Sequence, residues 1–359
     1  MRLIVYPVTF NALQDEIIGN LELAANKQAE LISKWMEECV SGARNIAKNP
    51  FIVQALQSGN TPENDVNEYL KSLCSDFGYR EVFSANRNGE VLFSSNQIFI
   101  GKNILNKDYH KKAISGVFFV SGIQPLQELT DNLFEPREED VPSMVIAAPV
   151  KNSTELIVGV LALRVAISEI DKMMRNIHLG ETGETYLVNK NGYMLTTSKY
   201  SGELLQENRI EKRTALELKV VDPFRNTLTK GVNECINGGD GYDANGYFDY
   251  RGVNVLGFWH WMPDYDWGVI AEIDAREGYG KLHKLRDSVM FIFAFLALGI
   301  VIVVFLLGKK ISSPLHSITD VAMKIADGNY SMRIDYQTGD DIGKLATAIN
   351  KMAELLEHR

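Results

Sequence analysis

The sequence has few cysteines and lacks the residue patterns that commonly bind metals. Its 359 residues include three cysteines, Cys39, Cys74 and Cys235, and none of them forms a CxxC pair. Because an odd number cannot all pair within the chain, we predict buried apolar cysteines, with a bridge between Cys39 and Cys74 as the alternative. The six histidines are scattered, without a pair at metal-ligand spacing. These absences predict no bound metal and no cofactor.

Catalytic motifs are also lacking. No P-loop, nucleophile elbow or HExxH sequence occurs. The run Gly238-Gly239-Asp240 continues with Gly241 instead of the Glu-Phe that a cyclase active site needs, and His316 lacks the acidic neighbour of a phospho-acceptor histidine. We therefore predict no catalytic residues and no enzymatic activity for the chain as given.

The chain has no excess of positive charge. It carries 37 lysines and arginines against 46 aspartates and glutamates, for a formal charge of -9. Binding to a phosphate backbone depends on positive charge, so the composition argues against a nucleic-acid partner. The acidic stretch Glu128–Asp140 is expected to form a solvated loop, with a cation site as the alternative.

Long apolar runs are absent except for one. The twenty residues from Val289 to Gly308 contain no charge, and a helix of that length rises about 30 Å, the thickness of a bilayer's hydrocarbon core. We predict a transmembrane helix at 289–308. Basic residues lie on both sides of it, so charge alone does not set its orientation.

Two short amphipathic segments follow the apolar run. Their apolar residues recur at steps of three and four, which is the pattern of a coiled-coil seam. The seam positions are Leu315, Ile318, Ala322 and Ile325 in the first segment and Ile342, Leu345, Ile349, Met352 and Leu356 in the second. Neither helix can bury such a seam alone, so the pattern predicts packing against further helices.

Three local signals give these two segments a family resemblance. Pro314 begins the first helix, Asp341-Ile342-Gly343 opens the second, and Asn350-Lys351-Met352 lies within it. In this order after a membrane span, residues 309–359 resemble a HAMP domain; an ordinary juxtamembrane helical hairpin is the alternative. The resemblance implies a parallel four-helix bundle and therefore a homodimer.

The part before the apolar run contains an internal repeat. Phe83–Ser95 reads FSANRNGEVLFSS and Tyr186–Ser198 reads YLVNKNGYMLTTS, so an Asn-Gly turn between apolar stretches recurs at an offset of 103 residues. Such a turn is a strong hairpin signal. Two long apolar strands end each unit. We predict an α+β fold in which one antiparallel-sheet, PAS-like module is used twice in tandem.

A long helix is expected before these modules. From about Asn11 to Asn49 the apolar residues keep mostly to steps of three and four, which predicts a spine helix that runs beside both modules. A second helix is expected to begin at Asp274, with Glu277 completing a capping box, and to continue through the membrane span.

This order of elements resembles a known kind of sensor. The residues that carry the resemblance are Asp108-Tyr109, Ala148-Pro149-Val150, Gly159-Val160-Leu161, Gly180–Val188 and Tyr250-Arg251-Gly252. Together with the HAMP-like segment they resemble the double-Cache extracytoplasmic region of bacterial histidine kinases, chemoreceptors and diguanylate cyclases. The predicted boundaries are 11–79 for the spine helix and its connection, 80–179 for a membrane-distal module and 180–280 for a membrane-proximal module.

The N-terminus departs from that family. Residues 1–10, MRLIVYPVTF, are too short to span a bilayer and lack a signal-peptide cleavage site. We interpret them as the outer end of a first transmembrane helix whose remainder precedes this chain. The resemblance implies a location in the cell inner membrane, with the sensor region extracytoplasmic and the HAMP-like segment cytoplasmic.

The resemblance also implies a small-molecule ligand in the distal module. In double-Cache proteins that bind amino acids, an arginine and a Trp-Tyr pair hold the carboxylate and aspartates hold the amino group. Here Lys107 and Tyr109 stand near the first position, and Arg164 stands where an aspartate is expected. We predict a site for an organic anion, formed by Lys107, Tyr109, Ser121 and Arg164. The alternative is that Lys107 and Arg164 are surface residues and the cavity is filled by its own side chains.

Two classes of function are compatible with these features. The first is a transmembrane sensor whose ligand displaces a helix and so changes the packing of the HAMP-like segment. The second is a membrane-bound enzyme whose catalytic domain follows Arg359. The expected output, through a cytoplasmic signalling domain or response partner, is in order a histidine kinase, a chemoreceptor or a diguanylate cyclase; a stand-alone sensor is a third class.

Overall fold

The computed structural model describes residues 2–58, 63–125 and 141–358. The acidic stretch Glu128–Asp140, expected to be a loop, lies outside these residues. The chain divides into two compact units, Met1–Gly280 and Lys281–Arg359, and each is described by itself.

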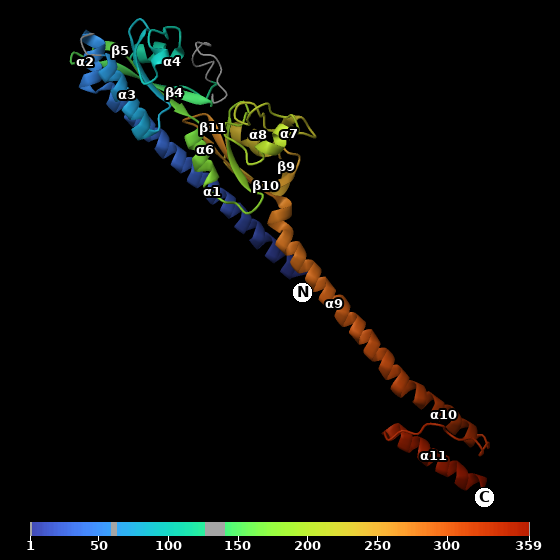
Figure 1. Cartoon of the computed structure of the whole chain (residues 1–359). Coiled ribbons are helices and arrows are strands. Elements are labelled where there is room, and N and C mark those ends of the chain that lie inside the picture. Colours follow the sequence, from blue (N-terminus) through green and yellow to red (C-terminus); the bar gives the residue numbers. More distant parts are fainter. Residues whose placement is uncertain (1, 59–62, 126–140, 359) are drawn as a thin grey trace. The chain divides into compact units, whose positions relative to one another are not determined.

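The first unit is organised along one long helix, α1 (Arg2–Ala47), which confirms the predicted spine helix. Its 46 residues span roughly 70 Å at 1.5 Å per residue, and it runs beside both sheets of the unit (Figure 1). Two further helices were not predicted: α2 (Pro50–Ser58) and α3 (Glu63–Phe77). The Asn49 side chain caps α2 by accepting a hydrogen bond from the Phe51 N–H at 2.9 Å.

The sheet of the module predicted to be membrane-distal, called the distal sheet, has the strand order β2-β1-β5-β4-β3, and all neighbours are antiparallel. Its strands are β1 (Glu81–Asn86), β2 (Val91–Ser94), β3 (Phe119–Val120), β4 (Ser143–Lys151) and β5 (Ile157–Ala166). The short helices η1 (Gln97–Phe99) and α4 (Asp108–Ile114) lie between β2 and β3 in the chain. Apolar side chains of one sheet face cluster with α1, and those of the other face cluster with Tyr109 of α4.

The second sheet has the order β6-β11-β10-β9 and is separate from the first. Its strands are β6 (Glu184–Asn189), β9 (Gly241–Phe248), β10 (Asn254–Met262) and β11 (Trp267–Asp274). Around it lie α6 (Ser168–Arg175), α7 (Ser201–Gln206), α8 (Lys230–Ile236) and the two-stranded ribbon β7 (Val221–Asp222) and β8 (Thr227–Leu228). In both sheets the first strand pairs with the last, which pairs with the strand before it. This shared connectivity confirms the predicted repeat.

The repeated Asn-Gly turn has the same structure in both modules. In each, the asparagine side chain, Asn86 or Asn189, accepts hydrogen bonds from the backbone N–H groups two and four residues later. The turn ends at a glycine with positive φ, +81° at Gly89 and +78° at Gly192, where a side chain would be strained. The sequence repeat is therefore a repeat of local hydrogen bonding.

The helix that leaves the first unit, α9 (Ala275–Leu307), begins directly after Asp274 and continues to the end of the apolar run, as predicted. The predicted capping box is wrong. The Glu277 carboxylate accepts hydrogen bonds from the backbone N–H groups of Glu181 and Thr182 at 2.8 and 2.7 Å. The Thr182 hydroxyl accepts a hydrogen bond from the Asp274 N–H at 3.2 Å. The loop before β6 supplies these partners, which are remote in sequence and so outside the reach of a local capping rule.

The three cysteines are free, so the alternative of a bridge between Cys39 and Cys74 is not realised. Cys39 and Cys235 are buried, as predicted, whereas Cys74 is only half-buried. Burial raises the pKa of each of these two thiols to about 12, which keeps them protonated and unreactive.

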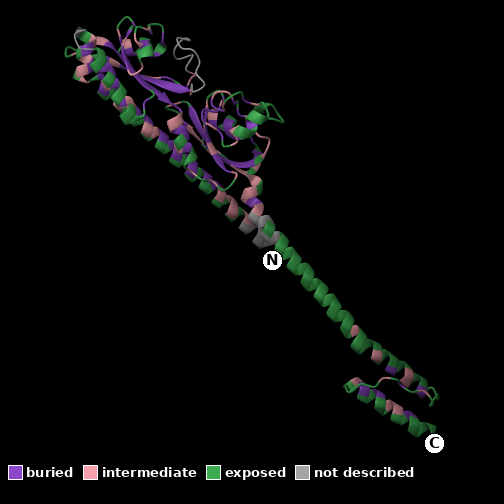
Figure 2. Cartoon of the chain, viewed as in Figure 1, coloured by how far each residue is buried: buried purple, intermediate pink, exposed green. Residues whose placement is uncertain are grey.

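The second unit carries an apolar helix with the length and composition of a membrane span, the one such helix among the described residues. Its apolar side chains are exposed (Figure 2), for example 77% for both Phe291 and Phe295. Exposing so much apolar surface to water is unfavourable, whereas a bilayer solvates it. The π-helical segment η2 (Gly308–Ser312) leads into α10 (Ser313–Ala326), and α11 (Asp341–Glu357) follows an extended connector.

Candidate functional site

A row of four side-chain positions crosses the distal sheet on the face that carries α4. Glu81 of β1 and Val145 of β4 are the direct neighbours of Arg164 on β5, and Ser121 follows β3 beside Val145. The next row along the strands contains Phe83, whose ring meets that of Tyr109 edge-on at 6.4 Å. The strand register therefore brings Arg164 and Ser121 onto the face against which Tyr109 packs.

Arg164 is held by a buried ion pair. Its Nε donates to the Glu81 carboxylate at 2.8 Å, and the two side chains are 7% and 8% exposed. Asn96 donates to the other carboxylate oxygen at 2.8 Å, and Nη1 of Arg164 lies 3.4 Å from the Ser143 hydroxyl. A guanidinium has five N–H donors in a planar fork, and these contacts use two of them and orient the group.

Only two of the four predicted ligand residues lie in the row of side chains just described. Arg164 and Ser121 lie in the row just described; the Ser121 hydroxyl donates to the Gly122 carbonyl and accepts from the Val145 N–H, both at 2.8 Å. Tyr109 covers the neighbouring row. Lys107 is the N-cap residue of α4 and only 8% exposed. Lys107 and Arg164 are both buried, so the first part of the alternative, that they are surface residues, is wrong. Its second part, that the cavity is filled by its own side chains, stays open.

Glu81 was missed by sequence reasoning, although a signal for it existed. The offset of 103 residues that relates the two Asn-Gly turns also relates Glu81 to Glu184. In the proximal module Glu184 faces Glu272 on β11 in the same register relationship that joins Glu81 to Arg164. The two modules thus share a position that holds a carboxylate-guanidinium pair in one case and a carboxylate-carboxylate pair in the other.

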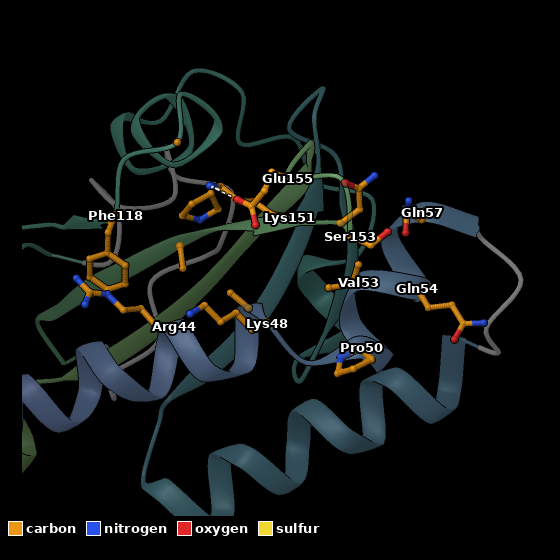
Figure 3. A pocket seen from close by; sticks show the side chains of 15 residues that line it. Arg44, Lys48, Pro50, Val53, Gln54, Gln57, Phe118, Lys151, Ser153 and Glu155 are labelled. Atoms are coloured by element: carbon orange, nitrogen blue, oxygen red, sulfur yellow. Dashed lines mark hydrogen bonds and ion pairs between the residues drawn. The ribbon is translucent and has the colours of Figure 1, made fainter.

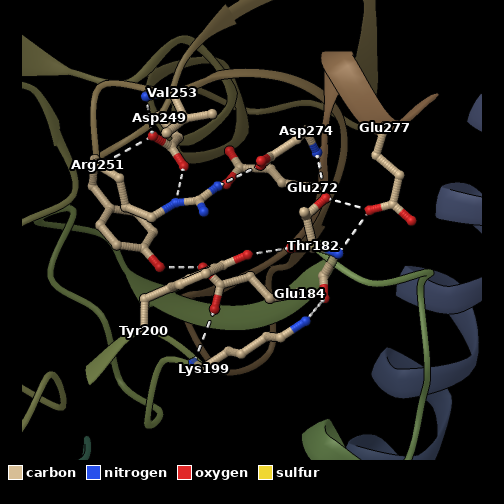
Figure 4. Close-up of polar contacts among 12 residues, drawn as sticks. Thr182, Glu184, Lys199, Tyr200, Asp249, Arg251, Val253, Glu272, Asp274 and Glu277 are labelled. Carbon is tan, nitrogen blue, oxygen red and sulfur yellow. Dashed lines mark hydrogen bonds and ion pairs between the residues drawn. The ribbon is translucent and has the colours of Figure 1, made fainter. Parts of the chain in front are cut away.

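The carboxylate pair of the proximal module, Glu184 and Glu272 (Figure 4), is buried. The hydroxyls of Tyr186 and Tyr247 donate to Glu272 at 3.0 and 2.6 Å, and the Tyr250 hydroxyl donates to Glu184. All three rings belong to the apolar cluster on this sheet face. The side chains of the proximal module therefore occupy the face that corresponds to the predicted ligand face of the distal module.

Burial shifts the titration of both glutamates. It raises the pKa of Glu272 to about 8, and the nearby Asp249 carboxylate adds to the shift. Burial raises the pKa of Glu184 as well. In each case burial disfavours the charged carboxylate.

Glu272→Gln is expected to weaken the pH dependence of folding stability. The folded state holds the Glu272 proton more tightly than the unfolded chain, whose value is 4.5, so the free energy of unfolding falls as the pH rises from about 4.5 to about 8. The full chain in nanodiscs can be unfolded with urea at several pH values, with tryptophan fluorescence as the signal. An unchanged slope in the variant would show that Glu272 does not titrate in this way.

A second polar cluster joins this module to the first turn of α9 (Figure 4). The Arg251 guanidinium forms ion pairs with the carboxylates of Asp249 at 2.6 Å and Asp274 at 2.8 Å. Its central carbon lies 3.9 Å from the centre of the Tyr200 ring. The Thr182 hydroxyl donates to Glu277 at 2.5 Å. The end of β11 and the start of α9 are therefore fixed to the proximal module by charge-assisted hydrogen bonds, which are the stronger kind.

The second unit shows why the HAMP-like sequence signals occur. A Cβ at Gly343 would lie 1.9 Å from the Thr338 carbonyl oxygen, so only glycine fits there. Asp340 caps α11 by accepting the Gly343 N–H at 2.9 Å. The Asn350 side chain forms two hydrogen bonds with the backbone of Ile334 in the connector, at 2.7 and 2.9 Å. These contacts fix the connector against α11.

The predicted seam is partly buried within one chain. Ile318 and Ile325 are buried, and Ala322, Ile342 and Ile349 are half-buried. Ile334 of the connector packs with Ile318 in the same cluster. The remaining seam residues are exposed in the single chain: Leu315, Leu345, Met352 and Leu356, at 38 to 50%. A single chain therefore buries only part of the seam.

Asn350→Ala is expected to loosen the connector. The substitution leaves the N–H and C=O of Ile334 without their side-chain partners, at about 1–3 kcal/mol, so trypsin should cleave after Arg333 about ten-fold faster. Cleavage of the full chain in nanodiscs, followed by mass spectrometry, measures this rate. Gln337→Ala, at an exposed position of the same connector, serves as the control; equal rates in the two variants would contradict the role given to Asn350.

Comparison with known families identifies both units. Residues 10–282 match the model of the Cache domain, which is most of the chain. The chain belongs to the Cache domain family. Residues 306–358 match the HAMP domain, so both resemblances seen in the sequence are confirmed. A Cache region and a HAMP domain with one apolar helix between them make this chain the sensor and HAMP part of a transmembrane receptor.

Two curated relatives of this Cache protein are methyl-accepting chemotaxis proteins named McpA. The one from Pseudomonas putida is 22% identical over 214 residues, covering 59% of this chain and 30% of the relative. The one from Bacillus subtilis is 20% identical over 262 residues, covering 71% and 33%. The chain thus spans about a third of the length of these relatives.

Solved structures of the Campylobacter jejuni chemoreceptor Tlp3 resemble the Cache region. Its sensory domain gives a TM-score of 0.53 at 16% identity, covering 75% of this chain and 98% of that one. Its ligand-binding domain in complex with 4-methylisoleucine gives 0.54 at 15% identity, covering 76% and 96%. At these identities the likeness shows the shared fold.

Proposed function

We propose that this chain is the sensing and relay part of a chemoreceptor that binds a small carboxylate in the distal Cache module. The observation that carries the proposal is the buried Arg164, oriented by Glu81 on the sheet face beside Tyr109. A guanidinium fork matches the geometry of a carboxylate. On the corresponding face of the proximal module, Tyr186, Tyr247 and Tyr250 take up the space, which favours the distal module as the ligand site.

The proposed site uses Lys107 and Arg164 for the ligand's charge, Tyr109 as an aromatic wall and Ser121 as a polar contact. Ser121 also lines a cleft of about 560 Å³ whose other walls include the turn Asn189-Lys190-Asn191 of the proximal module. A ligand that moves Ser121 therefore acts on the junction between the modules. The cluster of Thr182, Glu277 and Asp274 then passes the change to α9.

The two relatives are chemotaxis proteins, which supports a chemoreceptor output over the histidine kinase expected first from the sequence. The proposed receptor is a homodimer in the cell inner membrane, with the Cache modules outside and the HAMP domain in the cytoplasm. Ligand binding would bias two packings of the HAMP helices by about 1–3 kcal/mol.

Reading the codons that follow Arg359 tests the proposed output. A long helical repeat of seven residues is expected, as in a cytoplasmic chemoreceptor stalk. A histidine kinase's Asn-box, or a GGDEF sequence, would contradict the chemoreceptor proposal and leave the ligand site unaffected.

A further inference from the structure

A second cleft lies at the C-terminal end of α1, on the α1 side of the distal sheet (Figure 3). It lies between the end of α1, one face of α2 and the β4–β5 hairpin, and its volume of about 790 Å³ falls within the range of small-molecule sites. Ala148, which lines it, belongs to the apolar cluster that includes α1, whereas Arg164 lies on the opposite face. The cleft is therefore distinct from the proposed ligand site.

The charge of this cleft is unbalanced. Its walls carry the cations of Arg44, Lys48 and Lys151 against the single carboxylate of Glu155, which Lys151 already binds at 2.8 Å. The Arg44 guanidinium lies 4.9 Å from the centre of the Phe118 ring. Within the described part of the chain, neither Arg44 nor Lys48 has an ion-pair partner. The lining therefore carries a net charge of +2.

The rest of the lining is apolar or neutral. Ala47 and Val53 come from the helices, and Phe118, Ala148 and Pro149 come from the distal module. An inorganic anion would leave these groups facing water, whereas an organic anion with an apolar middle would cover them. The positive charge and the apolar lining of the cleft together indicate an organic anion as the ligand.

We propose that this cleft binds a small dicarboxylate with an apolar body. One carboxylate pairs with the Arg44 fork, which the Phe118 ring supports, and the other lies between Lys48 and Lys151. Such a ligand joins α1 to the β4–β5 hairpin. Because α1 runs beside both sheets, occupancy of the cleft stiffens the contact between the spine helix and the distal module.

Terephthalate, a rigid aromatic dicarboxylate, is a suitable probe. Terephthalamide has nearly the same shape and no charge, and it serves as the control. Titration calorimetry on the full chain in nanodiscs is expected to show binding of terephthalate and none of terephthalamide. Raising the salt concentration is expected to weaken the binding, because partly exposed charges are screened. The proposal is overturned if terephthalate does not bind at about 10 mM, or if both compounds bind equally.

Charge-removing variants locate the site. Lys48→Gln and Lys151→Gln are each expected to weaken terephthalate binding about five-fold, the upper range for a partly exposed pair. Lys34→Gln, at an exposed position of α1 outside the cleft, is expected to bind like the wild type. The double variant Glu81→Leu/Arg164→Met should also leave this binding unchanged, which separates the cleft from the proposed carboxylate site. Equal affinities of the Lys48 and Lys34 variants would overturn the assignment.

Discussion

Arg164→Ala is expected to lower the free energy of unfolding of the Cache unit by about 3–5 kcal/mol, because it leaves the buried Glu81 carboxylate without its guanidinium. It is also expected to abolish binding of a small carboxylate. Urea unfolding of the full chain in nanodiscs measures the first effect. The four tryptophans, Trp35, Trp259, Trp261 and Trp267, all lie in this unit, so their fluorescence reports on it.

A double variant separates folding from binding. In Glu81→Leu/Arg164→Met both charges are replaced by apolar groups of similar size, and the stability is expected to return to within about 1 kcal/mol of the wild type. Carboxylate binding is expected to remain lost. A double variant that binds carboxylates like the wild type would remove Arg164 from the ligand site, and a loss below about 1 kcal/mol in Arg164→Ala would contradict the buried pair.

Ile349→Asp is expected to disrupt the packing of the HAMP helices. Ile349 packs against the cluster of Ile318, Ile334 and Ala346, and a carboxylate placed there has no partner, which costs several kcal/mol. Cysteine introduced at Leu345, an exposed seam position in the single chain, reports the effect by crosslinking to its copy in membranes. The expected result is rapid crosslinking in the parent and little in the variant.

Lys351 provides two controls for the same experiment. Lys351→Asp places the same charge at an exposed position of the same helix and is expected to leave crosslinking at Leu345 intact. Cysteine at Lys351 is expected to crosslink slowly. If it reacts as fast as cysteine at Leu345, the seam assignment is wrong.

The elements that the sequence predicted correctly depend on local patterns. The Asn-Gly turns at Asn86 and Asn189 follow from hydrogen bonds within four residues, and the spine helix follows from a periodicity of three and four. The cap at Glu277 failed because its partners, Glu181 and Thr182, are almost a hundred residues away in the chain. A local rule does not include such partners.

The candidate site was predictable only in part. Arg164 was selected as a candidate because a basic residue stands where the family has an aspartate. Its ion pair with Glu81 could not be predicted, because it depends on a strand register between residues 83 apart. Glu184 and Glu272 were missed because the local sequence does not distinguish a buried carboxylate from a solvated one. Their burial results from the three tyrosine rings, which the tertiary fold brings together.

Ligand-induced stabilisation tests the central claim most directly. The full chain in nanodiscs is heated with a panel of small carboxylates and amines, and tryptophan fluorescence records unfolding of the Cache unit. At least one carboxylate is expected to stabilise the wild type, by about 2.7 kcal/mol at 100 times its dissociation constant, and to leave Glu81→Leu/Arg164→Met unchanged. If carboxylates leave the melting temperature unmoved while an amine raises it, the distal module is not a carboxylate sensor.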